Sequence, residues 1–261
     1  MENIYEASRL IGDAYASQIK DASPQVSVWL LHKLKHSFGV AHDIMDIFYA
    51  ERDLFASFSP AERQLVEISA ILHDLGRFYQ HRNGQHLSNR EYDHGIEAAK
   101  MLTGHPYFNQ PALLFAIAEH NHFAIDYTNP YYTNLPPAQQ KFASLMARLL
   151  RDADKLENMR YFAYHNIDRI GQLPQGVLSA GVKNCLRRRT NIISSEIRTA
   201  SDGAVGKLAW INDICFASTL KRIKELDFID SAILALKERG ASDADIDFLK
   251  THLNINEVTL V

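Results

Sequence analysis

Apolar residues recur at steps of three and four positions along most of the chain, the spacing of amphipathic helices. We expect a first helix over 1–20. A second begins at Pro24 and runs to about Phe58, with Gly39 as a point of interruption. The next start signal is sharper. Ser59-Pro60-Ala61-Glu62 has the form of a capping box with proline at the first helical position, so it predicts a third helix that ends near Gly76.

The middle of the chain alternates between helical and irregular patterns. Helices are expected over about 89–103, 111–123 and 137–165. The segment 77–90 is polar and lacks periodicity, so it is predicted to be a long loop of the kind that is often functional. A second loop, rich in Tyr, Asn, Thr and Pro, is expected over 126–137.

The C-terminal part has a weaker pattern. The glycine-containing stretch 166–189 is interpreted as a connection, and 190–239 as helical with an interruption around Ser201-Asp202-Gly203. Gly240 suits the position that follows a helix, and Ser242 with Asp245 predicts the start of a last short helix.

No strand pattern of useful length interrupts these helices, so the sequence predicts an all-α fold. Residues 1–165 carry the histidine-bearing helices. We expect 166–261 to be a helical extension packed on them, the two parts forming one structural unit.

Composition narrows the class of protein. The 261 residues are 46% hydrophobic and 23% charged, as in an ordinary globular protein. The net charge of −3 provides no general attraction for nucleic acid or anionic membranes. The two cysteines suggest a reducing compartment, and neither a signal peptide nor a membrane-spanning stretch is evident, so we expect a cytoplasmic protein.

His73-Asp74, at the end of an apolar helix, is the first candidate for chemistry. Adjacent side chains reach one ion only where a helix ends or bends, and imidazole with carboxylate suits Mn, Fe, Ni, Zn or Mg. Four further candidates lie in or beside other predicted helices, which can point such residues into one interior space: His36, His94, His120 and Asp154.

Each candidate also has a purely structural interpretation. His36 and His120, taken singly, can be core histidines bonded to backbone carbonyls. His94 stands beside Asp93 at a helix start that accepts any polar residue. Arg77 can pair with an acidic residue, and Lys155 can lie on a solvated face.

The order His, His-Asp, Asp resembles the HD superfamily of metal-dependent phosphohydrolases. Four blocks spanning about 32–162 carry the resemblance: ILHDLGRF, DHGIEAAKML, AIAEHNHFAI and LLRDADKLENM. The last block also resembles one found in alarmone hydrolases. The resemblance implies an HD-domain helical bundle with additional C-terminal helices.

Within this resemblance the four-residue core corresponds to His36, His73, Asp74 and Asp154, while His94 and His120 match the histidines that hold a second ion. One or two divalent ions are therefore implied, with Mn, Fe, Ni, Mg and Zn not distinguished. Asp152 rivals Asp154 as the last ligand because helical spacing sets it nearer the apolar stripe; the motif favours Asp154.

The implied activity is hydrolysis of a phosphate ester or phosphoanhydride in a small substrate, favoured to be a nucleotide, by metal-activated water. Asp74 and Asp154 would hold the ions and help to take up the proton of the water. Arg77 and Lys155 would stabilise the phosphoryl oxygens, and His122 or His81 would protonate the leaving group. The alternatives are a non-catalytic regulatory module that binds metal or nucleotide, and a di-iron oxygenase. The C-terminal part has no motif; covering the cleft, contacting substrate and forming a homodimer remain open.

Overall fold

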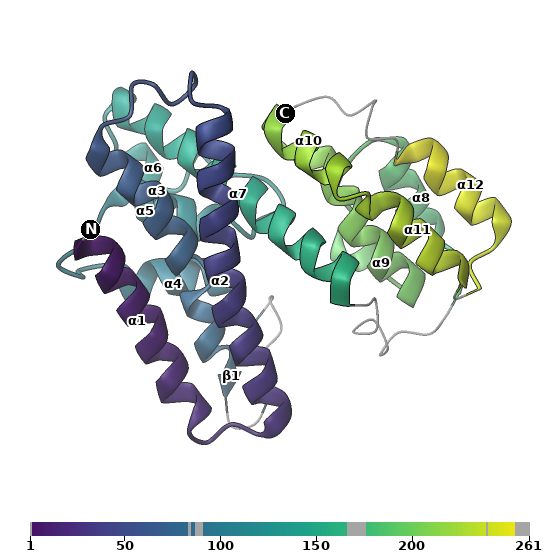
Figure 1. The fold of residues 1–261 in the computed structure, drawn as a ribbon, viewed down its shortest axis with the longest axis horizontal. Helices are drawn as coiled ribbons and strands as arrows, with labels where there is room; N and C mark the ends of the chain where they lie inside the picture. Colours follow the sequence, from purple (N-terminus) through teal and green to yellow (C-terminus); the bar gives the residue numbers. More distant parts are fainter. Residues whose placement is uncertain (1, 83–84, 87–90, 166–175, 239, 254–261) are drawn as a thin grey trace. The chain divides into compact units, whose positions relative to one another are not determined.

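The computed structural model describes residues 2–82, 85–86, 91–165, 176–238 and 240–253. These residues are helical throughout, apart from turns and one short hairpin, so the predicted all-α fold is confirmed (Figure 1). The chain divides into two compact units, Met1–Asp154 and Lys155–Val261. The division falls inside one long helix, α7 (Pro137–His165), whose bounds agree with the predicted 137–165.

The first unit contains two groups of packed helices. In one, α1 and α2 both pack against α3, and in the other α4 packs against α5 and the 3-10 helix η1. Their bounds are α1 Glu2–Ile19, α2 Pro24–Ala50, α3 Pro60–Leu72, η1 Leu75–Tyr79, α4 His94–Leu102, α5 Pro111–Glu119 and the short α6 Pro130–Thr133.

α2 begins as predicted but ends earlier. Ser23 caps its first turn, with Pro24 at the first helical position, and the helix runs without a break to Ala50. The predicted end at Phe58 and the interruption at Gly39 are therefore wrong. Beyond Ala50 the chain turns back because its aromatic side chains pack on those of the helix: the rings of Phe48 and Phe55 stack with centroids 4.8 Å apart.

α3 has the predicted capping box. The Ser59 hydroxyl accepts a hydrogen bond from the Glu62 amide (3.3 Å), and the Glu62 carboxylate accepts one from the Ser59 amide (2.7 Å). The helix ends at Leu72, before the predicted Gly76, and the chain tightens into η1. η1 therefore extends into the predicted loop 77–90, where β1 (His81–Arg82) also pairs antiparallel with β2 (Gln85–His86).

The second unit is also helical. Its elements are α8 Ala180–Arg187, η3 Ser194–Glu196, α9 Ala200–Leu208, η4 Ala209–Asp213, α10 Ala217–Glu225, α11 Phe228–Glu238 and α12 Asp243–His252. α8 lies in the stretch that was predicted to be a connection, whose residues 166–175 are outside the described part of the chain.

Ser201-Asp202-Gly203 does not interrupt a helix. Thr199 and Asp202 form a capping box, so these residues make the first turn of α9. The two predictions for the end of the chain are confirmed: Gly240 has a positive φ of 89° after α11, and the Ser242 side chain accepts from the Asp245 amide at the start of α12.

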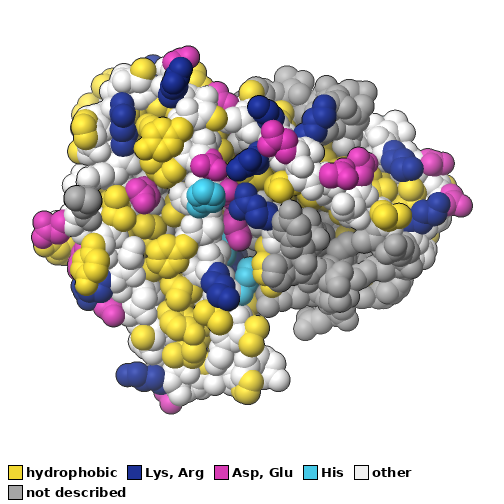
Figure 2. Space-filling view, in the orientation of Figure 1, with side chains coloured by type: hydrophobic (Ala, Val, Ile, Leu, Met, Phe, Trp, Pro, Cys, Tyr) yellow, Lys and Arg dark blue, Asp and Glu magenta, His cyan; other side chains and the backbone are white. Residues whose placement is uncertain are grey.

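Among the described residues no helix combines the length and the apolar character needed to cross a membrane. Hydrophobic side chains nevertheless gather on the face of the first unit that Figure 2 shows. The large hydrophobic residues exposed on α2 are Val28, Leu31, Phe38 and Tyr49. Phe38 is 43% exposed because the buried face of α2 passes through Ser37, Val40 and Ala41.

Candidate metal centre

Four of the predicted ligands stand at helix ends. His73 is the residue after α3 and Asp74 precedes η1, so the chain changes direction between them and both side chains point to the same place. His94 is the first residue of α4, and His120 follows the last residue of α5. The expectation that His73 and Asp74 stand where a helix ends is confirmed.

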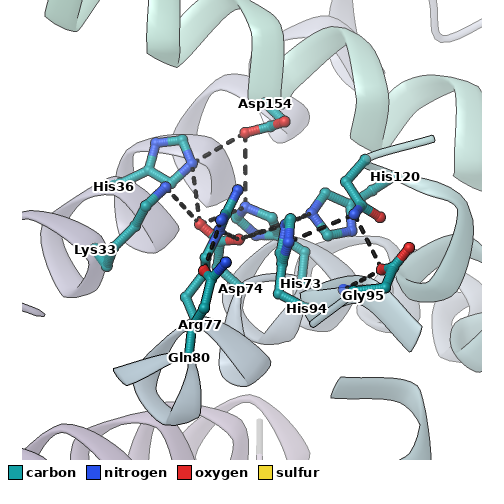
Figure 3. A network of polar contacts seen from close by, with 12 residues as sticks. Lys33, His36, His73, Asp74, Arg77, Gln80, His94, Gly95, His120 and Asp154 are labelled. Atoms are coloured by element: carbon teal, nitrogen blue, oxygen red, sulfur yellow. Dashed lines mark hydrogen bonds and ion pairs between the residues drawn. The ribbon is translucent and has the colours of Figure 1, made fainter. Parts of the chain in front are cut away.

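The other two predicted ligands come from long helices. His36 lies within α2 and is buried, and Asp154 lies within α7. Figure 3 shows the six side chains pointing toward one another, with Lys33 and Arg77 beside them. The structure thus brings together all six residues that the resemblance singled out.

Asp74 stands at the centre of the group and faces a different pair of histidines with each oxygen. Oδ2 lies 3.6 Å from Nε2 of both His36 and His73. Oδ1 lies 3.3 Å from Nε2 of His94 and 3.7 Å from Nε2 of His120. Each histidine pair with Asp74 forms a buried group whose ligand atoms all lie within 4.8 Å of one another.

Asp154 completes the first of these groups. Its Oδ1 lies 3.0 Å from His36 Nε2 and 3.7 Å from His73 Nε2. This agrees with the motif, which favoured Asp154 over Asp152. Two imidazole nitrogens and two carboxylates therefore face one point, while two further imidazole nitrogens share Asp74 at a second point.

The backbone fixes which nitrogen of two histidines faces the centre. Nδ1 of His73 donates to the Ala70 carbonyl and Nδ1 of His120 to the Ile117 carbonyl, both at 2.7 Å. In the neutral ring Nε2 then carries a lone pair. For His73 that nitrogen is buried, and the described residues provide no hydrogen-bond partner for it. A buried acceptor aimed into a cluster of carboxylates fits a bound cation.

Protonation states also suit metal binding. Burial tends to raise the pKa of Asp74, but the charge of Lys33 and contacts with the surrounding histidines outweigh it and hold the pKa well below 3.8. Burial, followed by the charge of Arg77, lowers the pKa of His94, and burial lowers that of His120. Ionised carboxylates and neutral imidazoles are the forms that bind divalent metals.

Two cations contact the central carboxylate. Lys33 Nζ lies 2.9 Å from Asp74 Oδ2, and Arg77 Nε lies 3.4 Å from Asp74 Oδ1. Arg77, a predicted site residue, is therefore at the cluster, and its Nη1 also donates to Gln80. Lys33 was not predicted. Its spacing of three residues from His36, which puts both on one face of α2, is the signal that could have identified it.

Lys155, the third predicted catalytic residue, belongs to the second unit. Its ammonium donates to the backbone oxygen of Asp213 at 2.7 Å and to the carboxylate of the same residue at 2.6 Å. Its predicted contact with substrate phosphate stays a prediction.

His122, the suggested proton donor, lies between two carboxylates. Its ring nitrogens are 2.8 Å from Glu119 Oε2 and 3.0 Å from Asp93 Oδ2. The hydrogen bond to Asp93, and then the one to Glu119, raise the pKa of His122 to about 10. The ring is thus an imidazolium that donates both protons to these carboxylates. The side chain of His81, the other suggested donor, lies outside the described residues.

Arg151 binds backbone carbonyl oxygens at the C-terminal end of α5. It is buried, and its Nη1 donates to the carbonyl oxygens of Glu119 (3.1 Å) and His122 (2.5 Å). A guanidinium at this position satisfies carbonyls that the end of the helix leaves unpaired and interacts favourably with the helix dipole. Arg151 thus fixes the backbone on both sides of His120.

Comparison with protein-family models gives a match in the first part of the chain. Residues 34–159 match the family model of the HD domain, and this range contains all six clustered residues. Neither the curated proteins nor the solved structures yield a match.

Proposed function

Because residues 34–159 belong to the HD-domain family, whose members are usually metal-dependent hydrolases, we propose that this chain hydrolyses a phosphate ester or phosphoanhydride with the help of divalent metal. The observation that carries the proposal is the position of Asp74, whose two oxygens face two separate pairs of buried histidines. A carboxylate in this position suits a bridge between two ions.

The ligands divide into two sets. One ion would be held by His36, His73 and Asp154. A second ion would be held by His94 and His120, and Asp74 would bind both ions. All donors are nitrogen or oxygen, which fits Mn, Fe, Ni, Zn or Mg and disfavours thiophilic ions. Bound divalent ions would supply Lewis-acid stabilisation of phosphoryl oxygens and activation of water near neutral pH.

Lys33 and Arg77 would bind the phosphoryl oxygens of the substrate. They are close to opposite oxygens of Asp74, and their side chains are only 12% and 18% exposed. Partly buried cations stabilise the negative charge of phosphoryl oxygens more strongly than solvated ones do. Lys155 would join them only if its pair with Asp213 opened.

The carboxylates Asp74 and Asp154 would hold the ions and help to take up a proton from the attacking water. Both stay ionised at neutral pH: burial favours their neutral form, but Lys33 beside Asp74 and the hydrogen bond from His36 to Asp154 help to keep both pKa values well below 3.8. We propose a nucleotide as substrate because the resemblance to nucleotide-cleaving HD proteins favours it.

Metal analysis by mass spectrometry tests the proposal. The protein is purified without chelator or affinity metal, and wild type is compared with His73→Ala and His94→Ala. His42→Ala is the control, because the side chain of His42 is 70% exposed on α2. We expect about two ions per chain in wild type and control, fewer in both site variants, and phosphate release from a nucleotide panel only when ions are bound.

Protein that binds no metal after incubation with Mn²⁺, Fe²⁺ or Ni²⁺ would overturn the proposal. Bound iron with uptake of O₂ and no release of phosphate would favour the oxygenase alternative, since the same nitrogen and oxygen donors also suit iron.

A further inference from the structure

One imidazole joins the two acidic residues that precede the second pair of histidines. Asp93 comes directly before His94, and Glu119 directly before His120. The two ring nitrogens of His122 bind these two carboxylates, at 3.0 and 2.8 Å respectively. The N-cap of α4 is thereby linked to the last residue of α5 (Figure 3 shows the two histidines that follow them).

Both carboxylates are fixed by other contacts as well. Asp93 Oδ1 accepts hydrogen bonds from the amides of Gly95 and Ile96 and from the Asn121 side chain, all at 3.0–3.1 Å. Glu119 Oε2, the oxygen that binds His122, also accepts from the Asp126 amide. Because neither carboxylate can move freely, the imidazole between them sets the distance from one helix end to the other.

The Asp93–His122–Glu119 bridge joins helix ends that carry only one of the two ligand groups. His94 and His120, on the helix ends that it joins, have their Nε2 atoms 3.2 Å apart. The first group is held by different contacts, which include those of His36 with Asp154 and of His73 with the Ala70 carbonyl. Loss of the bridge is therefore expected to disturb the second group selectively.

We propose that His122 is a positioning residue that holds His94 and His120 at the separation needed for the second metal ion, without governing the first. The inference rests on the proposed metal centre. Groups that orient ligand histidines typically change metal affinity by about 10- to 100-fold when they are removed.

The test compares wild type with two variants that break the bridge from opposite sides. In His122→Gln the side-chain amide cannot contact both carboxylates. Asp93→Asn keeps an N-cap acceptor for Gly95 and Ile96, since Asn caps as well as Asp. It replaces the other carboxylate oxygen, which binds His122, with an amide nitrogen. Chelator-treated protein is titrated with Mn²⁺ by calorimetry, and electron paramagnetic resonance detects coupled Mn²⁺ pairs.

We expect wild type to bind two ions and to show the signal of a coupled pair. Both variants should bind the first ion with unchanged affinity, bind the second about 10- to 100-fold more weakly, and lose the coupled signal. Asn129→Ala is the matched control. It removes another hydrogen bond to Glu119 but leaves the Asp93–His122–Glu119 bridge intact, so it should retain both ions.

The outcomes separate this inference from the proposed function. Wild type that binds none of Mn²⁺, Fe²⁺ and Ni²⁺ would overturn both. Wild type that binds one ion, or variants in which the second ion binds as tightly as in wild type, would overturn the positioning role alone. So would equal weakening of both ions, or selective loss of the second ion in Asn129→Ala, because either result indicates a general structural effect.

Discussion

Gly76 lies against the carbonyl oxygen of His94, so closely that a Cβ added to Gly76 would stand 2.2 Å from that oxygen. This approach packs η1 onto the first turn of α4. It also brings Asp74, two residues before the glycine, within 3.3 Å of His94. Only glycine permits this contact, since any other side chain would force the backbone of α4 away.

Gly76→Ala is expected to destabilise the protein and to weaken the second metal group. Overpacking of this kind costs about 1–3 kcal/mol. In urea unfolding of the metal-free protein, the free energy of unfolding of Gly76→Ala should be lower than that of wild type by this amount. Titration should also show a reduced affinity for the second Mn²⁺ ion.

Gly12→Ala is the control for the chemical change, because nothing lies within 4 Å of a Cβ at that position in α1. Alanine there should stabilise the helix, by about 0.5–1 kcal/mol. If Gly76→Ala were as stable as wild type and bound two ions, the close approach of η1 and α4 would not be needed to build the site.

Lys33→Met is expected to impair hydrolysis while leaving metal content unchanged. The ammonium is 2.9 Å from Asp74, but it is a cation and so is not a metal ligand; its proposed role is to bind substrate phosphate. Removal of one such group typically lowers the rate by about 100- to 1000-fold. Phosphate release and metal analysis on the same preparations measure the two effects.

The control for that experiment is Lys35→Met, which makes the same substitution two residues later on the exposed face of α2. It should retain wild-type activity and metal content. A normal rate in Lys33→Met would exclude this lysine from substrate binding, whereas a loss of metal would show that the charge of Lys33 organises the ligands.

Local signals were sufficient to predict several helix boundaries. The capping box at Ser59, the glycine at 240 and the serine cap at Ser242 each depend on hydrogen bonds or backbone angles within a few residues, and all three are present. The end of α2 depends instead on Phe48 stacking with Phe55, a contact between side chains that periodicity does not reveal.

The candidate site likewise combines residues that the sequence predicts with contacts that it does not. The motif order identified the six clustered residues, but the groups around them come from spatial contacts. Glu119 and Asp93 look like ordinary acidic residues until the structure shows both bound to His122. Their position directly before two candidate ligands was a usable signal, although nothing in the sequence indicated that one imidazole would bind both.

The charge of His122 is expected to make stability depend on pH. Its pKa rises from 6.5 to about 10 on folding, chiefly through the hydrogen bond to Asp93. A group whose pKa is raised on folding stabilises the protein fully below its unfolded pKa, and this contribution is lost as the pH rises through the folded pKa. The contribution of His122 should therefore decline between pH 6.5 and about 10.

Urea unfolding of metal-free wild type and His122→Gln across pH 6–10 measures this contribution, because other titrating groups are common to both proteins. The stability difference should be largest near pH 6 and should shrink steadily toward pH 10. A difference that stays constant over this range would mean that the ring is neutral between its two carboxylates.

Asp245 provides a corresponding test in the second unit. This buried carboxylate accepts from Lys183 Nζ at 2.6 Å and from the Leu178 amide at 3.2 Å, joining α12 to the start of α8. Asp245→Asn should lower the free energy of unfolding at pH 7 by about 1–3 kcal/mol. The substitution removes the negative charge of the carboxylate that accepts the hydrogen bond from Lys183. Trp210 fluorescence in a Trp29→Phe background reports on this unit alone, because these are the two tryptophans of the chain.

The effect should disappear in acid. Burial raises the pKa of Asp245, but the hydrogen bond from Lys183 and that from Leu178 outweigh it, and the net pKa lies below 3.8. A lowered pKa stabilises the folded state above the unfolded value, and the contribution is lost as the pH falls through the folded value. The difference in free energy of unfolding between wild type and Asp245→Asn should therefore narrow below about pH 4.

Asp243→Asn is the control, at a side chain 85% exposed on the same helix, and it should show no such gap from wild type at any pH. A gap of equal size in both variants would mean that Asp245 acts only through the general charge of α12, and not through its bond to Lys183.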